Sequence, residues 1–125
     1  MNRKGFTLIE LILVIAILGI LAVSALPRFL DISDEAENAA RDGVVGAVRA
    51  GVAIFHADAI VNNTTPVWPA TLDSAADGAC AAANICFDTV LESGVTDDWS
   101  KAGLVYTYTP TGDTFTYVPA TGVFQ

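Results

Sequence analysis

The chain has 125 residues, of which 53 % are hydrophobic, and its 14 acidic against 6 basic side chains give a formal net charge of −8. The first 26 residues carry much of the apolar excess, and the 99 that follow suffice for one small domain. The acidity argues against nucleic acid as a direct partner of the isolated chain.

The first predicted element is an apolar run over residues 6–26, in which three side chains are polar: Thr7, Glu10 and Ser24. As a helix it would be about 31 Å long, enough to span the roughly 30 Å core of a bilayer. Arg3 and Lys4 precede the run, and five acidic residues follow it within residues 31–42. The positive-inside rule therefore predicts a cytoplasmic N-terminus and an external C-terminal body.

Glu10 is the unusual residue of this run. An ionised carboxylate at such a position costs about 2.5 kcal/mol or more, so we expect it to have a partner. A cut between Gly5 and Phe6 would create one, the new α-amino group of Phe6. Within one helix the two groups lie about one turn apart, so pairing is easier between neighbouring chains offset along their axes. Glu10 is therefore predicted to set the register of an assembly.

The segment Gly5-Phe6-Thr7-Leu8-Ile9-Glu10-Leu11 resembles the cleavage and methylation signature of type IV prepilins and of type II secretion pseudopilins. The resemblance implies a leader, residues 1–5, that a prepilin peptidase removes after Gly5, and N-methylation of Phe6 at the new N-terminus. It also implies that Glu10 aligns subunits in a helical filament built on an inner-membrane assembly platform. Residues 17–30 are similar to pilins of the mannose-sensitive haemagglutinin type. Without the leader the formal charge is −10 before the new amino group is counted, because 4 basic residues remain against 14 acidic ones.

Two other interpretations of the N-terminus stay open. One is a secretory signal peptide cleaved after Ala25, although the apolar run exceeds the usual 7 to 15 residues and Glu10 would serve no purpose there. The other is a plain single-span anchor.

Beyond Pro27, apolar residues recur at helical spacing and predict the amphipathic half of one long helix over residues 27–61. The expected core-facing stripe is Ala36, Ala40, Gly43, Val44, Ala47, Gly51, Ile54 and Phe55. Because Pro27 cannot donate a hydrogen bond to the carbonyl four residues back, we expect a kink or local melting there, and Gly19 weakens the helix further. The resemblance implies that the stretch between Gly19 and Pro27 unwinds during assembly.

Three glycines lie inside the amphipathic half of the predicted helix. Gly43, Gly46 and Gly51 each cost the helix about 1 kcal/mol relative to Ala. Either close approach of a sheet or a neighbouring subunit compensates this cost, or the domain simply tolerates it.

A globular head is predicted over residues 62–125. Strands at 104–109 and 114–118 flank a turn at 110–113, which is a hairpin signature, and a last short strand is expected at 123–125. The expected fold class is α+β, the ladle-shaped type IV pilin fold in which a long N-terminal helical spine packs on a small antiparallel sheet. Residues 90–92 fit a short helix or a strand.

Cys80 and Cys86 are predicted to form a disulfide, as an even cysteine pair in an exported domain usually does. The alternative, half of a metal site, lacks companion ligands, because His56 is the only histidine and lies elsewhere in the sequence. Weaker signals are overlapping glycosylation sequons at Asn62 and Asn63 and a calcium site at the acidic pair Asp97-Asp98, with Asp113 as an optional third ligand. Turn chemistry and solvated turn residues explain these signals better.

The sequence thus predicts a structural protein with no catalytic residues, no cofactor and no metal. We expect a major subunit of a type IV pilus that passes from the inner membrane to the cell surface and serves adhesion or motility. The alternatives are a pseudopilin of a type II secretion system and a membrane-anchored domain that binds its target as a monomer.

Overall fold

The computed structural model describes residues 4–125, so the predictions for Arg3 and for the leader before Lys4 lie outside the described residues. One helix and five strands make up the fold: α1 (Leu8–Val61), β1 (Gly78–Ala79), β2 (Trp99–Ala102), β3 (Val105–Tyr108), β4 (Asp113–Val118) and β5 (Val123–Phe124). The chain forms two compact units that divide between Ala36 and Glu37. The first is the N-terminal part of α1, and the second contains the rest of α1 and all five strands.

Helix α1 confirms the prediction of one long helix and begins two residues later than expected, at Leu8. The helix is uninterrupted at Gly19 and Pro27. Local melting, one of the two outcomes expected at Pro27, is therefore absent from this structure. The unwinding of this stretch during assembly stays a prediction.

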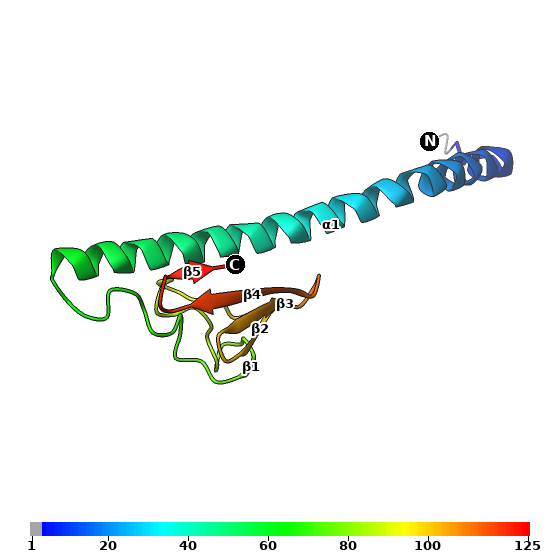
Figure 1. The fold of residues 1–125 in the computed structure, drawn as a ribbon. Coiled ribbons are helices and arrows are strands. Elements are labelled where there is room, and N and C mark those ends of the chain that lie inside the picture. Colours follow the sequence, from blue (N-terminus) through cyan, green and yellow to red (C-terminus); the bar gives the residue numbers. More distant parts are fainter. Residues whose placement is uncertain (1–3) are drawn as a thin grey trace. The chain divides into compact units, whose positions relative to one another are not determined.

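The five strands form one antiparallel sheet in the order β1-β2-β3-β4-β5 (Figure 1). The predicted hairpin is confirmed as β3 and β4, with Tyr106 opposite Phe115 and Tyr108 opposite Asp113. The predicted last strand is β5. Strands β1 and β2 were not predicted, because β2 begins at Trp99 directly after the Asp97-Asp98 pair that indicated a turn.

The core of the second unit lies between the sheet and residues 37–61 of α1. The helix contributes Val45, Val48 and Val52, which pack with residues of the loops and strands: Leu72, Phe87, Trp99, Tyr106, Tyr117 and Phe124. Figure 1 shows β5 beside this part of α1, and Arg49 donates a hydrogen bond to the carbonyl of Phe124.

The predicted core-facing stripe of α1 was largely wrong. Ala36, Ala40, Gly43, Ala47 and Ile54 are exposed, Ile54 to 70 %. Gly51 is buried, while Val44 and Phe55 are half-buried. The buried face is rotated about the helix axis because three valines remove more apolar area from water than alanines and glycines do.

The three helix glycines have different surroundings. A Cβ added at Gly51 would collide with the backbone carbonyl of Val90, whereas Gly43 and Gly46 have no neighbour within 4 Å of such an atom. Close approach therefore accounts for Gly51. Val90 belongs to a turn, and residues 90–92 form neither the short helix nor the strand that the sequence allowed.

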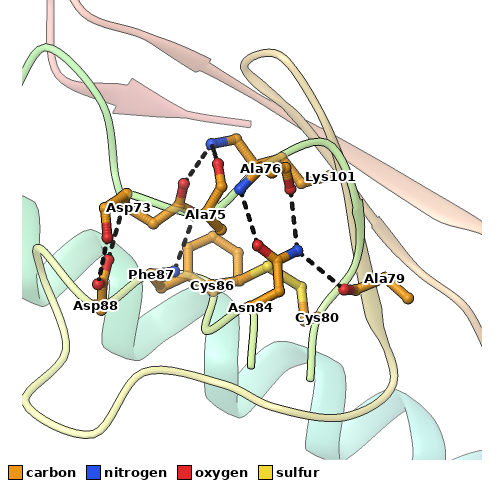
Figure 2. The surroundings of a disulfide bond; sticks show 11 residues. Asp73, Ala75, Ala76, Ala79, Cys80, Asn84, Cys86, Phe87, Asp88 and Lys101 are labelled. Carbon is orange, nitrogen blue, oxygen red and sulfur yellow. Dashed lines mark hydrogen bonds and ion pairs between the residues drawn. A yellow bond between two sulfur atoms is a disulfide. The ribbon is translucent and has the colours of Figure 1, made fainter. Parts of the chain in front are cut away.

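The predicted disulfide between Cys80 and Cys86 is present, with the two Cα atoms 5.5 Å apart (Figure 2). Inside the loop, the side chain of Asn84 accepts a hydrogen bond from the N–H of Ala76 and donates to the carbonyls of Ala76 and Ala79. The two sulfurs are bonded to each other, and the ring of His56 stacks on Trp68 at a centroid distance of 3.6 Å.

Candidate assembly segment

The N-terminus of α1 is closed by a capping box that involves Glu10. Thr7 precedes the first helical residue, and both its backbone N–H and its hydroxyl donate to Glu10 Oε2 at 2.8 Å. In return the N–H of Glu10 lies 3.3 Å from Thr7 Oγ1. Such reciprocal bonds satisfy backbone donors that the first helical turn leaves unpaired.

The role of Thr7 was missed at the sequence level, although its signal is present. A Thr followed three residues later by Glu, directly before an apolar run, is the sequence pattern of a capping box. Glu10 therefore has a local partner in its own chain in addition to the intermolecular partner predicted for it.

The hydroxyl of Ser24 also forms hydrogen bonds within α1. Its hydroxyl donates to the carbonyl of Ile20 at 2.9 Å and lies 3.3 Å from that of Leu21. All three polar side chains of residues 6–26 are thus hydrogen-bonded within their own chain, and the surface of this segment is apolar.

That apolar surface is uncovered. Between Leu8 and Ile32 the large apolar side chains are 49 % to 77 % exposed. Helix α1 contains a stretch long and apolar enough to cross a membrane, by length and composition. A patch of this size on an isolated subunit indicates a surface that contacts lipid or other protein chains.

The predicted cleavage point lies immediately before the helix. Gly5 and Phe6 belong to a non-helical segment, and Phe6 is 94 % exposed. In this chain the nitrogen of Phe6 is still part of a peptide bond, so its pairing with Glu10 of another chain stays a prediction.

The calcium ligands considered above are not brought together in the described chain. Asp113 pairs with Arg41 and accepts a hydrogen bond from Thr111. Asn62 is engaged with Asp58 through its side-chain amide. Within residues 4–125, no cluster of three or more His, Cys, Asp or Glu side chains is arranged to hold a metal ion.

Comparison with known proteins defines the class of the N-terminal segment. Residues 1–26 match the family described as "Prokaryotic N-terminal methylation motif". This match confirms the resemblance to the type IV prepilin signature.

Individual relatives agree with this class. The chain is 54 % identical over 54 residues to the type IV narrow pilus major component PilA5 of Thermus thermophilus. The aligned residues cover 43 % of this chain and 47 % of that protein. It is 40 % identical over 82 residues to the fimbrial protein EcpC of Eikenella corrodens, covering 66 % and 48 %. It is 46 % identical over 50 residues to the type IV major alpha-pilin of Moraxella bovis, covering 40 % and 31 %. The chain spans about half or less of the length of these relatives, and no solved structure matches it.

Proposed function

We propose that the chain is a structural subunit, and a major pilin, of a type IV pilus. The observation that carries the proposal is the exposed Gly5–Phe6 junction, followed by a capped, uncovered apolar helix with a single carboxylate. The relatives named above are pilus and fimbrial proteins, which favours a pilus over a secretion pseudopilin. The role is structural and not catalytic.

The proposed sequence of events starts in the inner membrane. Residues 6–26 hold the precursor in the bilayer with its N-terminus in the cytoplasm, where a prepilin peptidase cuts after Gly5 and the amine of Phe6 is methylated. An inner-membrane assembly platform then adds the subunit to a filament of identical copies. The carboxylate of Glu10 pairs with the amine of Phe6 in a neighbouring copy and so sets the offset between them, because either charge is tolerated in an apolar core only when paired.

The capping box supplies a sharp test of the role of Glu10. Glu10→Gln removes the charge but retains an acceptor for the capping box, whereas Thr7→Ala removes the two hydroxyl bonds of the box and retains the charge. If Glu10 sets the register, Glu10→Gln loses filaments and Thr7→Ala keeps them. The opposite result, filaments from Glu10→Gln at the wild-type level, would show that Glu10 is only a helix cap.

Processing is tested separately by the intact mass and N-terminal residue of protein sheared from cells that express the chain. A methylated Phe6 at the start of the chain in the sheared filament fraction supports the proposal. A start at Leu26 would indicate a secreted domain, and an uncut chain confined to membranes would indicate a static anchor. Either of these last results overturns the proposed function.

A further inference from the structure

Cations are scarce in this chain. Beyond Gly5 there are 4 Lys or Arg side chains against 14 acidic ones. Three of the four are engaged within the described chain: Arg41 with Asp42 and Asp113, Arg49 with the carbonyl of Phe124, and Lys101 with Asp73. Arg28 is exposed, and residues 4–125 offer it no hydrogen bond or ion pair in this structure. It is the cation available to another molecule.

Arg28 is followed by two large apolar side chains that are also uncovered. Phe29 is 70 % exposed and Leu30 64 %. Both lie beyond residues 6–26, which already provide the length that a bilayer core requires. The Arg28–Leu30 segment is therefore suited to an apolar groove that has a carboxylate at its edge.

The second unit contains such a groove. It has a volume of about 310 Å³ and is lined by Gly51, Ile54, Phe55, Asp58, Thr89 and Val90. Gly51 and Val90 are in close contact where they line it, and Ile54 on its wall is largely exposed. The groove thus combines uncovered apolar surface with one acidic side chain.

Within the described chain, the carboxylate of Asp58 has one unpartnered oxygen and lies at the end of α1 that disfavours a negative charge. The amide of Asn62 donates to Oδ1 at 2.9 Å, and the described structure gives Oδ2 no partner. A carboxylate near the C-terminus of a helix faces the negative end of the helix dipole, at a cost of about 0.3–1 kcal/mol. The last turn of α1 has no basic residue to offset this cost.

We propose that the Asp58 groove of one subunit binds the Arg28–Leu30 segment of a second copy of the chain, with Arg28 paired to Asp58. This inference rests on the proposed filament function and names the contact that extends it. Copies that carry a strong negative charge repel one another, so a contact that uses the free cation is favoured. The two surfaces are different parts of the subunit, and such a head-to-tail contact generates an open filament when its rotation does not close a ring.

Charge reversal tests the pairing. Arg28→Asp and Asp58→Arg are each expected to lower the yield of sheared filaments at least about tenfold, and the double reversal to restore it to within about threefold of wild type. A cation suits the last turn of a helix, so Asp58→Arg is not expected to unfold the subunit. Glu92→Arg makes the same charge change at an exposed acid outside the groove and should leave the yield unchanged. Normal filaments from either single variant, or no recovery in the double variant, overturns the pairing.

Cross-linking separates this inference from the proposed function. Arg28→Lys retains the charge and provides a primary amine, which a carbodiimide joins to a carboxylate in contact with it. Filaments of this variant are expected to give covalent dimers in which residue 28 of one subunit is linked to Asp58 of another. Filaments of the wild-type chain, whose Arg28 has no primary amine, should not give this link and provide the matched control. Abundant filaments without the 28-to-58 link overturn the inference alone, whereas a wild-type chain that forms no filaments overturns the proposed function as well.

Discussion

Lys101 and Asp73 form a buried ion pair that joins β2 to the loop before the disulfide (Figure 2). Lys101 Nζ donates to Asp73 Oδ1 and, at 2.7 Å, to the carbonyl of Ala75. Asp73 Oδ2 accepts the N–H of Phe87 at 3.0 Å. Each polar atom of the pair therefore has a partner, which is the condition under which a buried pair is tolerated.

Replacing Lys101 alone should destabilise the folded chain strongly. Lys101→Met leaves the carboxylate of Asp73 buried without a counter-charge, and we expect the free energy of unfolding to fall by about 3–5 kcal/mol. Adding Asp73→Asn keeps an acceptor for Phe87 without the charge, so the double variant should lose less than the single one. Urea unfolding of the detergent-solubilised chain, followed by tryptophan fluorescence, measures both. Equal losses would mean that the ion pair is not the cause.

Gly51 and Gly46 form a matched pair for a packing test. Gly51→Ala places a methyl group against the carbonyl of Val90, and overpacking of this kind typically costs about 1–3 kcal/mol. Gly46→Ala meets no neighbouring atom and should gain up to about 1 kcal/mol from better helix propensity. The same unfolding measurement should therefore shift in opposite directions for the two variants. A shift in the same direction would contradict the assigned packing of Gly51.

The disulfide closes a short loop, so its contribution to the free energy of unfolding should be moderate. From the loop-closure entropy of the unfolded chain, replacing Cys80 and Cys86 together by Ser should lower the free energy of unfolding by about 2 kcal/mol. Addition of a reductant should reproduce this loss in the wild-type chain and have no effect on the double variant. An unchanged unfolding midpoint in both cases would mean that the Asn84 hydrogen bonds hold the loop without the disulfide.

Two carboxylates should make the second unit sensitive to acid. Hydrogen bonds from the N–H and hydroxyl of Ser74 lower the pKa of Asp88, and the Thr111 hydroxyl together with Arg41 lowers the pKa of Asp113. A pKa that is lower in the folded chain favours the folded state fully above the unfolded value of about 3.9, and this contribution disappears as the pH falls through the folded value. Urea midpoints measured from pH 7 down to pH 3 should therefore fall at the acidic end.

A variant isolates one of these contributions. Asp88→Asn cannot titrate, so its urea midpoint should fall less below about pH 4 than that of the wild-type chain. Identical pH profiles for the two proteins would show that Ser74 does not stabilise the Asp88 carboxylate.

The sequence was a good guide where one pattern had one physical cause. The hairpin of β3 and β4 alternates β-branched and aromatic residues around a Pro-Thr-Gly-Asp turn, and Gly112 adopts the positive φ of 78° that such a turn requires. The apolar run and its carboxylate identified the candidate assembly segment, because a charged residue in an apolar helix is costly wherever it lies.

Elsewhere one pattern was compatible with several structures. Residues 36–61 of α1 contain many alanines and glycines, so a stripe drawn by spacing alone could not tell which face the sheet would cover. Val45, Val48 and Val52 decide this through the area that they bury with Phe87 and the strand aromatics. Strand β1 has two residues and exists because it pairs with β2. No local sequence pattern predicts such a long-range contact.

The internal hydrogen bonds of Thr7, Glu10 and Ser24 bear on the energetics of moving a subunit. A helix that satisfies its own polar groups loses none of these bonds when lipid chains around it are exchanged for the apolar helices of its neighbours. In the proposed pilus, transfer between the two surroundings then breaks no hydrogen bond between Thr7 and Glu10, whereas the predicted unwinding between Gly19 and Pro27 would break the bonds of Ser24. The free-energy difference between bilayer and proposed fibre then depends on the charge of Glu10 and on that unwinding.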